Sequence, residues 1–327
     1  MSPLHLLLLL LPLAYSLTVT IPSAVQNASS LPLRVSSELA SLASLDAPKL
    51  SAINASAFDW WYFDVVAREY SLVCTFFAAS ESAFPFLYPS SSVLGAYLWL
   101  EKDGQVWHAH FPASLALLHS SHPDEIAGDW QDAGFVFDGV SHDDHLVYQL
   151  DIHTANLTGS ISIQAPMMRN EQYLSEIGWV NPLPDGTAQV SLVLDGKEIS
   201  FHGSGYHDKN WSNQAFASRV STWSWGHAHL VEQGRSVSLV WLHVVSPANE
   251  TSSAVYLAIN GEILANYQAG ILSVSSTENT TRVAVREEFV FTFLKERVIA
   301  SNDPYYFRWA GREMDRPGVV LFEQFTL

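Results

Sequence analysis

Short apolar runs separated by turn signals repeat along most of this chain, from about residue 59 onward. The runs have the length of strands, and pairs such as Asp195-Gly196 and Asn260-Gly261 mark tight turns between them. Hardly any segment has the period of an amphipathic helix. The pattern therefore predicts an all-β protein. The expected strands are 60–66, 72–77, 94–100, 106–111, 134–137, 146–152, 159–163, 188–194 and 198–202 in a first series, and 222–231, 236–245, 254–259, 263–267, 271–275, 281–294, 298–301, 305–309 and 319–325 in a second.

Two such series predict two antiparallel barrels or sandwiches in tandem. A length of 327 residues fits two domains of roughly 150 residues each. We place the first domain at residues 58–212 and the second at residues 213–327. Residues 17–57 are rich in Ser, Ala and Leu and lack a clear period, so we expect an extended N-terminal arm with one short helix.

The first 16 residues have the features of a secretory signal peptide. An apolar run covers residues 6–11, and small residues stand at the −3 and −1 positions of a cut after Ser16. No later stretch of the sequence is long and apolar enough to span a membrane. We therefore expect residues 1–16 to be removed and the mature protein to pass through the secretory pathway without a membrane span.

Six sequons of the type Asn-x-Ser/Thr support the same compartment, since chance would give roughly two. One of them, at Asn210, lies inside a motif that we expect to be buried. Burial competes with glycosylation there, so we expect Asn210 to stay unmodified. Glycans are expected at Asn27, Asn54, Asn156, Asn249 and Asn279.

The charge balance excludes some classes of partner. The formal net charge is −17, and only 15% of residues are charged. Nucleic acids and anionic membrane surfaces require clustered Lys and Arg, so we expect neither as a partner. A small, weakly polar ligand fits better. The single cysteine, Cys74, lies in an apolar run, which is typical of an inert core thiol.

Residues 205–211, with the sequence Gly-Tyr-His-Asp-Lys-Asn-Trp, form the most informative segment. The run is too polar for an ordinary core strand, because each buried polar group needs a partner. Side chains on a strand alternate between two faces, and either face could line a pocket. The alternation would put Tyr206, Asp208 and Asn210 on one face, and His207, Lys209 and Trp211 on the other.

Two other segments are rich in aromatic residues. Residues 58–64 contain Trp60 and Trp61, which a strand would place on opposite faces. Such rings could pack a core or form the wall of a pocket for a flat or polyene ligand. In residues 222–229, alternation gives one shared face to Trp223, Trp225, His227 and His229.

The histidines raise the question of a metal site. His227 and His229 share a face, and His243 lies on the next expected strand, but there is no cysteine partner and no HExxH motif. Aromatic neighbours favour hydrogen-bonded histidines, so we expect no metal. The sequence also lacks a GxSxG elbow, a phosphate loop and a dinucleotide fingerprint. We expect no cofactor, which leaves chemistry that a shaped pocket with a few donors can perform.

Three blocks of the sequence resemble a known family in order and approximate spacing. The blocks are residues 60–64 (Trp-Trp-Tyr-Phe-Asp), 203–211 (Gly-Ser-Gly-Tyr-His-Asp-Lys-Asn-Trp) and 223–227 (Trp-Ser-Trp-Gly-His). From about residue 58 onward the chain is similar to the family of bacterial carotenoid hydratases, the hydroxyneurosporene synthase-like proteins, and fungal Diels–Alderases. The resemblance implies two tandem lipocalin-like β-barrels, with the ligand in the first barrel or at the junction.

The resemblance also implies a function. It points to a cofactor-free pericyclase of fungal secondary metabolism that performs a stereoselective Diels–Alder or hetero-Diels–Alder cycloaddition on a small hydrophobic terpenoid or polyketide. The short chain is most similar to the group that joins a tropolone-type quinone methide to a humulene-type sesquiterpene. Such a reaction needs two π-systems held face to face, and positioning supplies about 7–11 kcal/mol of the barrier.

The candidate site residues come from the same three blocks and the strand that follows them. Tyr206, His207, Asp208 and Asn210 are the candidate catalytic donors and acid–base groups. The candidate substrate-binding residues are Trp61, Tyr62, Lys209, Trp211, Trp223, Trp225, His227, Trp241 and His243.

Other interpretations stay open at this point. The chain could be a hydratase of isoprenoid or carotenoid double bonds, a decalin-forming Diels–Alderase, or a lipocalin-like carrier without catalysis. Many carotenoid hydratases have Gly-Arg where this chain has Gly226-His227, which weighs against hydratase chemistry. Asp208, Asn210 and Trp211 would serve equally well to tie two barrels together.

Overall fold

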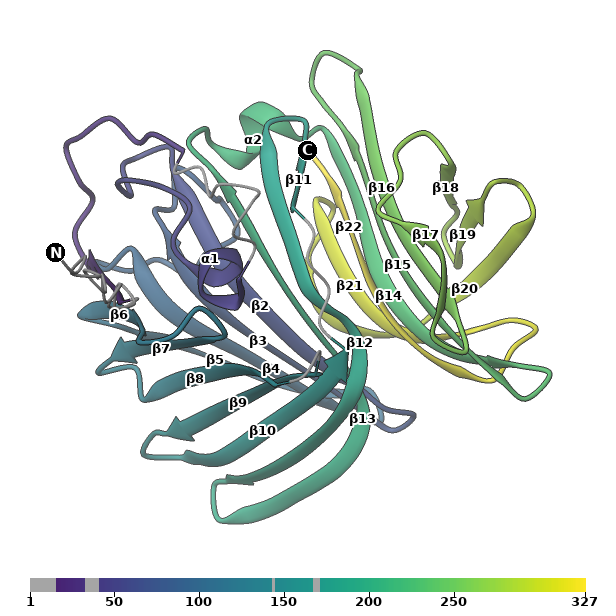
Figure 1. Ribbon diagram of the computed structural model, residues 1–327, viewed down its shortest axis with the longest axis horizontal. Coiled ribbons are helices and arrows are strands. Elements are labelled where there is room, and N and C mark those ends of the chain that lie inside the picture. Colours follow the sequence, from purple (N-terminus) through teal and green to yellow (C-terminus); the bar gives the residue numbers. More distant parts are fainter. Residues whose placement is uncertain (1–15, 33–40, 143–144, 167–170) are drawn as a thin grey trace, which may run out of the picture.

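The structure is a computed structural model that describes residues 16–32, 41–142, 145–166 and 171–327. Nearly all regular structure in these residues is β-strand, in two large antiparallel sheets (Figure 1). Two short helices, α1 (Leu42–Asp46) and α2 (Phe216–Arg219), are the exceptions among the described residues. None of the described helices has the length and hydropathy to cross a membrane.

The first sheet has 13 strands within the described residues. Figure 1 shows it curling into a half-barrel, with α1 in its concave side. Its strands are β1 (Leu17–Pro22), β2 (Phe58–Val66), β3 (Tyr70–Ala79), β4 (Leu94–Lys102), β5 (Gln105–Pro112), β6 (Leu115–Ser120), β7 (Glu125–Gln131), β8 (Phe135–His142), β9 (His145–His153), β10 (Leu157–Pro166), β11 (Glu171–Leu174), β12 (Ile177–Leu194) and β13 (Lys197–Ser212). They run in the order β1-β6-β7-β8-β9-β10-β12-β13-β2-β3-β4-β5, and β11 pairs with β12.

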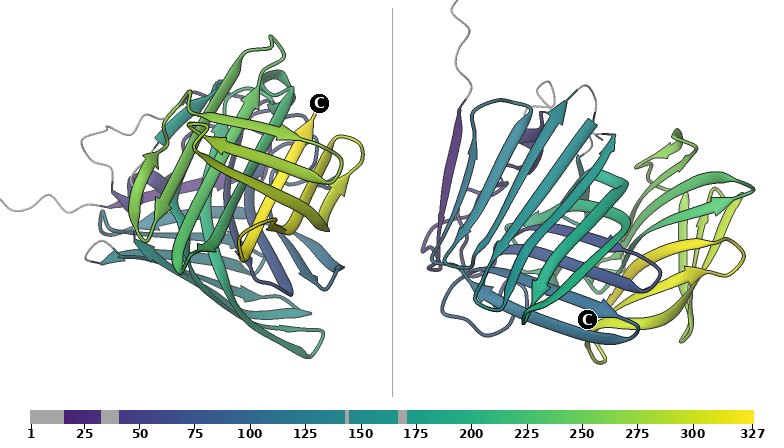
Figure 2. Two further views of the ribbon diagram at one scale, coloured as in Figure 1. Left: turned by 90° about the vertical axis from the view of Figure 1, so that its right-hand side faces the viewer. Right: turned by 90° about the horizontal axis from the view of Figure 1, so that it is seen from below.

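The second sheet has nine strands and lies beside the first, as the two further views show (Figure 2). Its strands are β14 (Thr222–Glu232), β15 (Arg235–Val245), β16 (Thr251–Ile259), β17 (Glu262–Asn266), β18 (Leu272–Ser276), β19 (Thr280–Val285), β20 (Phe289–Asn302), β21 (Tyr306–Glu313) and β22 (Gly318–Thr326). They run in the order β17-β16-β15-β14-β22-β21-β20-β19-β18.

Three apolar clusters hold these sheets together. The first fills the concave side of the first sheet and includes Trp61 and Trp130. A second, which contains Trp241, fills the far side of the second sheet. The third lies between the sheets and contains Trp60 and Trp225. Burial of large rings in all three clusters is the main source of stability, at roughly 25 cal/mol for each Å² removed from water.

Strands β2 and β13 are covered on both faces, which explains their unusual sequences. Every residue of β2 is buried, and so are the last nine of β13. One face of each strand packs into the first sheet's core and the other against the second sheet. The sequence of a strand that is covered on both faces is a continuous apolar or aromatic run and does not alternate between apolar and polar residues. The polar groups on these strands must therefore find partners inside the protein.

Polar ties also join the two sheets. Nδ1 of His229 on β14 lies 2.7 Å from Oδ2 of Asp185 on β12. Nε of Arg297 on β20 lies 3.1 Å from Oε1 of Glu101 on β4. These contacts fix how one sheet sits on the other and so define the space between them.

The prediction of an all-β, lipocalin-like fold with two antiparallel units in tandem is confirmed, and the first unit is a half-barrel. Both ladders are open among the described residues, because β1 and β5 end the first sheet and β17 and β18 end the second. The last strand of the first sheet ends at Ser212 and the first strand of the second begins at Thr222. Strands β6 and β7 were not expected: β7 mixes polar and apolar types without a clear run, whereas β6 contains the short apolar run of residues 115–118, which the sequence analysis missed.

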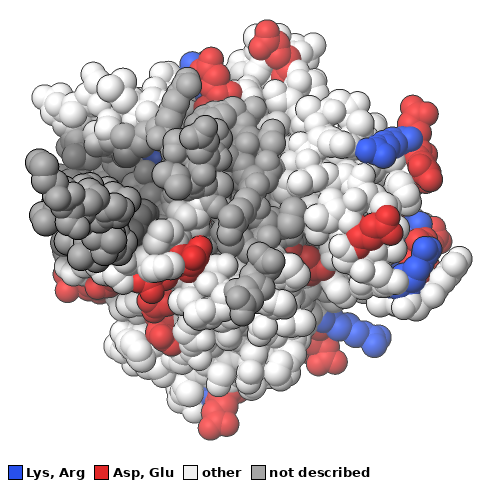
Figure 3. Space-filling view, in the orientation of Figure 1, with Lys and Arg blue, Asp and Glu red and all other residues white. Residues whose placement is uncertain are grey.

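The N-terminal region was expected to contain a signal peptide and an extended arm. The expected arm of residues 17–57 carries β1, which pairs with β6, and helix α1. Apart from Ser16, the expected signal peptide lies outside the described residues. On the face drawn in Figure 3, the charged side chains of the described residues are scattered and form no broad basic patch.

Close packing of side chains explains why one of the family-like blocks has a glycine at position 226. Gly226 on β14 pairs with Trp241 on β15, and the indole lies over it. A Cβ at position 226 would come within 2.5 Å of that ring. A side chain here would have to displace the indole of Trp241 and would also meet Cβ of Phe322 on β22.

The buried pair Lys209–Asp59 gives a test of the packing on the concave side. Both side chains are almost completely inaccessible, and Nζ of Lys209 donates to Oδ1 of Asp59. We expect Lys209→Met to lower the free energy of unfolding by about 3–5 kcal/mol, because it leaves a buried carboxylate without its partner. The exposed Lys197→Met should change it by about 0.5 kcal/mol or less. Equal small effects in urea unfolding would contradict the pairing.

Candidate active site

A cavity of about 570 Å³ lies between the two sheets. Its volume is in the usual range for small-molecule sites, about 300–1,000 Å³. One wall comes from β2, β3, β4 and β13 of the first sheet, and the opposite wall from β14 and β20–β22 of the second. The segment of residues 84–88, between β3 and β4, closes a further side. Large buried rings such as Trp61 and Trp241 lie in the apolar clusters on the other sides of the two sheets, whereas this cavity lies at the junction between the sheets.

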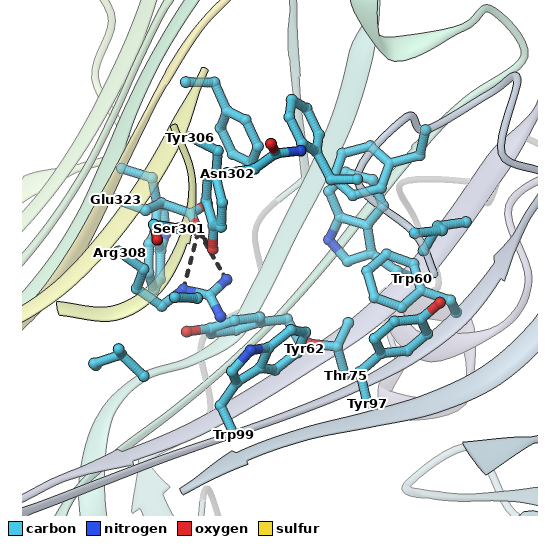
Figure 4. Close-up of a pocket in the computed structure, with 18 of the residues that line it drawn as sticks. Trp60, Tyr62, Thr75, Tyr97, Trp99, Ser301, Asn302, Tyr306, Arg308 and Glu323 are labelled. Atoms are coloured by element: carbon cyan, nitrogen blue, oxygen red, sulfur yellow. Dashed lines mark hydrogen bonds and ion pairs between the residues drawn. The ribbon is translucent and has the colours of Figure 1, made fainter. Parts of the chain in front are cut away.

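Aromatic rings form most of the cavity wall (Figure 4). The ring centroids of Trp60 and Phe84 are 5.0 Å apart, and those of Tyr62 and Trp225 are 5.1 Å apart in an edge-to-face arrangement. Such packing holds the rings rigid and presents flat apolar surface to a ligand. The aromatic residues that line the cavity are Trp60, Tyr62, Phe77, Phe84, Phe86, Tyr88, Tyr97, Trp99, Phe216, Trp223, Trp225, Tyr306 and Phe325.

One end of the cavity is polar. Nη2 and Nε of Arg308 donate to Oε2 of Glu323, at 2.7 and 3.1 Å. The hydroxyl of Tyr306 donates to the same oxygen at 3.2 Å. The guanidinium carbon of Arg308 lies 5.1 Å from the ring centroid of Tyr62 and 5.7 Å from that of Trp99. Figure 4 shows these side chains gathered at one end, with Trp60 and Tyr97 farther along.

Burial strongly alters the ionisation of Asp208, which lines the cavity. Its Oδ2 accepts hydrogen bonds from Nε1 of Trp179 at 2.7 Å and from the hydroxyl of Tyr206 at 2.8 Å. That hydroxyl in turn accepts from Nε1 of Trp225 at 3.2 Å. Burial raises the pKa of Asp208 to about 8, although the donors on Oδ2 act in the opposite direction. Asp208 is therefore largely a neutral acid near pH 7.

The proton of this acid belongs on Oδ1. Both donors that contact the carboxyl group point at Oδ2, and Oδ1 has no hydrogen-bond partner among the described residues. Asp208 also lines the cavity. The arrangement presents a neutral O–H donor to a bound molecule from a buried position in the cavity wall.

The candidate residues of β13 separate onto two faces, as strand alternation predicts. Asp208 and Asn210 line the junction cavity, and Tyr206 supports Asp208 from behind. Oδ1 of Asn210 accepts from Nε1 of Trp60 at 3.1 Å, and its Nδ2 donates to the carbonyl of Gly178 at 3.5 Å.

The other face of β13 points into the first sheet's core, away from the cavity. His207 stacks on Phe63 with centroids 3.9 Å apart, and its Nε2 lies 3.1 Å from the carboxylate of Asp46 at the end of α1. Nζ of Lys209 lies over the ring of Trp61. These residues, together with Trp211, connect β13 to the N-terminal arm.

The candidate site residues on the second sheet also lie in different places. Trp223 and Trp225 line the cavity. His227 lies behind it, with Nε2 at 2.7 Å from Oδ1 of Asp64 and its ring stacked on Tyr206. Trp241 and His243 are on the opposite face of the sheet, because Gly226 and Ser224 are their register partners.

This alternation also bears on the question of a metal. His227 and His243 lie on opposite faces of the second sheet, so they cannot share one ion. No group of three or more His, Cys, Asp or Glu residues within the described part of the chain has a metal-binding arrangement.

Sequence reasoning missed Arg308 and Glu323. Both stand inside apolar runs that we read as strands, residues 305–309 and 319–325. A charged residue within such a run indicates either an exposed face or a buried pair, and pattern alone does not distinguish the two. Their register shows the pairing: Arg308 on β21 lies opposite Glu323 on β22.

Comparison with known proteins agrees with this architecture. The model of the Diels-Alderase-like family matches residues 23–284. The chain is 28% identical over 243 residues to the quinolone epoxide rearrangement protein penF of Penicillium thymicola, covering 67% of this chain and 65% of penF. It is 24% identical over 195 residues to the Diels-Alderase poxQ of Penicillium oxalicum, covering 54% of this chain and 43% of poxQ. The chain thus spans about two thirds or less of the length of these curated relatives.

Among solved structures, the crystal structure of CghA with Sch210972 is similar over 95% of this chain and 98% of CghA. The TM-score is 0.68 at 15% sequence identity. At this identity the likeness shows the fold alone. It confirms that two sheets of this kind can form one tandem architecture.

The raised pKa of Asp208 predicts a pH-dependent stability. The folded protein keeps a proton that the unfolded chain releases near its ordinary pKa of 3.8, so the native state binds more protons between about pH 4 and pH 8. The free energy of unfolding should therefore fall as pH rises through this window, by up to about 1.4 kcal/mol per pH unit from this group.

Asp208→Asn keeps the shape of the side chain and an oxygen that can accept the two hydrogen bonds now made to Oδ2, but it cannot ionise. Urea unfolding as a function of pH should show a flatter profile in this variant than in the wild type. The exposed Asp195→Asn serves as the control and should leave the profile unchanged. Identical profiles for wild type and Asp208→Asn would show that Asp208 titrates normally.

Asn210 provides a test of burial at the cavity wall. Its side chain is 2% exposed and bonded at both ends, whereas Asn27, Asn156, Asn249 and Asn279 are exposed and Asn54 is half-buried. We expect peptide mapping of the protein made in a eukaryotic secretory host to find Asn210 unmodified and glycans on exposed sequons. A fully occupied glycan on Asn210 would place the motif on the surface and contradict the structure.

Proposed function

This chain belongs to the Diels-Alderase-like family, and we propose that it is a cofactor-independent cyclase acting on a small, mostly apolar substrate in the junction cavity. The observation that carries the proposal is the neutral carboxylic acid of Asp208, set in an aromatic cavity of about 570 Å³. Flat walls can confine an unsaturated substrate in one folded pose. A single donor can then act on an oxygen of that substrate.

The leading candidate reaction is a Diels–Alder or hetero-Diels–Alder cycloaddition. Confinement by rings such as Trp60, Trp225 and Trp99 would place diene and dienophile in contact, which supplies about 7–11 kcal/mol of the barrier. A hydrogen bond from Oδ1 of Asp208 to a carbonyl of the substrate would stabilise developing charge, worth about 2.7–4 kcal/mol in a dry site. No net proton transfer is needed. The pairing of a tropolone-type quinone methide with a humulene-type terpene stays a prediction that rests on the sequence resemblance alone.

A second candidate, epoxide rearrangement, is favoured by the same neutral acid. It is also consistent with the name of penF, a relative of this chain. Asp208 would give its proton to the epoxide oxygen as a C–O bond breaks. A substituent would then migrate to the resulting cation, a carbonyl would form at the carbon that keeps the oxygen, and the proton would return to Asp208. Aromatic walls would stabilise the cation.

Two substitutions of Asp208 distinguish these reactions. Asp208→Asn keeps a donor at the same place but cannot transfer a proton. It should therefore retain cycloaddition within about ten-fold, and lower epoxide rearrangement by about 10²–10⁴-fold. Asp208→Leu removes the donor and should impair both. Asp195→Asn is the matched control and should leave both unchanged.

The assays would supply a panel of quinolone epoxides, and separately a quinone methide generated in situ with humulene, and follow products by chiral chromatography and mass spectrometry. Oxygen gained from labelled water would indicate a hydratase instead. Unchanged rate and stereochemical ratio in both assays, together with tight ligand binding, would identify a carrier and overturn the enzymatic proposal.

We also propose that the protein follows the secretory route. The apolar run within residues 1–16 and the number of sequons support this location.

A further inference from the structure

Two buried hydrogen-bond donors at the polar end of the junction cavity have no partner within the described part of the chain. They are the hydroxyl of Tyr62 and Nη1 of Arg308. Both residues line the cavity, and they are 5% and 7% exposed. Native proteins rarely leave such groups unpaired, because each costs about 1–3 kcal/mol when buried without an acceptor. Figure 4 shows the two side chains next to each other.

The other two nitrogens of the Arg308 guanidinium already have an acceptor. Nε and Nη2 each donate one N–H to Glu323, whereas Nη1 has no acceptor for either of its N–H groups within the described residues. Burial keeps Tyr62 protonated by raising its pKa, so its hydroxyl is a donor throughout the physiological range. The two groups are therefore preorganised to share one acceptor, or two adjacent ones, that the protein itself does not provide.

The charges around these donors favour an uncharged acceptor. The positive charge of Arg308 is matched by the carboxylate of Glu323, which lies within 2.7 Å. Behind them, Asp64 is paired with His227. An anionic ligand would add a negative charge to a dry, already neutralised cluster, and such a charge is costly to bury. A carbonyl oxygen satisfies both donors and adds no charge.

We propose that the polar end of the cavity, at Tyr62 and Arg308, is a subsite for a neutral carbonyl oxygen, such as that of a lactam, ketone or ester. The inference rests on the proposed function only in taking the junction cavity as the substrate site. It narrows the substrate to molecules with an apolar unsaturated body and an uncharged carbonyl head. The carbonyl head would lie at this end and the apolar body along the rings of Trp60 and Phe84.

Three probes of one size test this inference by binding, without turnover. N-methyl-2-quinolone has a neutral lactam carbonyl, 2-naphthoate has a carboxylate, and 2-methylnaphthalene has no oxygen. Equilibrium dialysis near pH 7 should show the wild-type protein binding the lactam about ten-fold or more tightly than either other probe. Equal or tighter binding of 2-naphthoate would identify an anion site. Equal binding of 2-methylnaphthalene would mean that water satisfies these donors.

Two matched Tyr→Phe variants locate the effect. Tyr62→Phe removes the unpartnered hydroxyl and should weaken lactam binding about five- to ten-fold, with hydrocarbon binding unchanged. Tyr305→Phe changes a tyrosine that is 52% exposed and is not part of the cavity lining, and it should change lactam binding by about two-fold or less. Equal losses in both variants would overturn the proposal.

Stability gives an independent readout. Tyr62→Phe should melt at the wild-type temperature or above it, because the lost hydroxyl has no partner in the protein. A purely structural role for Tyr62 would instead lower the melting temperature. Lactam selectivity without turnover of any substrate would sustain the carbonyl subsite and defeat the cyclase. Turnover of a substrate without lactam selectivity would sustain the cyclase and defeat the carbonyl subsite.

Discussion

The desolvation of one carboxyl group between two sheets is the constraint on which the site depends. Asp208 lies on a strand covered on both faces, where burial outweighs the hydrogen bonds that would favour its ionised form. The result is a weak acid that stays protonated near neutral pH. If the two sheets moved apart and water entered, the carboxyl group would ionise and lose its capacity to donate.

The double coverage of β13 explains why its motif is both polar and buried. One face, with Asp208 and Asn210, meets the junction cavity. The other, with His207 and Lys209, is held by the arm and the first sheet's core. The structural and functional interpretations of this motif are therefore compatible, because alternation assigns them to different side chains. The contacts on the core side fix the position of the strand that carries the acid.

The sequence allowed the fold class and the two series of strands to be predicted, because apolar runs and turn pairs are local signals. It also allowed the two faces of β13 to be predicted, since alternation depends only on neighbouring residues. It did not show that Trp60, and not the candidate Trp61, lines the cavity, because which face of β2 meets the cavity depends on how the second sheet packs. Arg308 and Glu323 pair through register across two strands, which is likewise a tertiary property.

The most direct test of this account is the protonation state of Asp208, observed by ¹³C NMR of aspartate carboxyl carbons across a pH titration. The resonance that disappears in Asp208→Asn identifies the group. We expect its midpoint near pH 8, in line with the raised pKa. A midpoint near the ordinary value of 3.8 would mean that Asp208 is ionised in the folded protein, and would contradict the proposed donor.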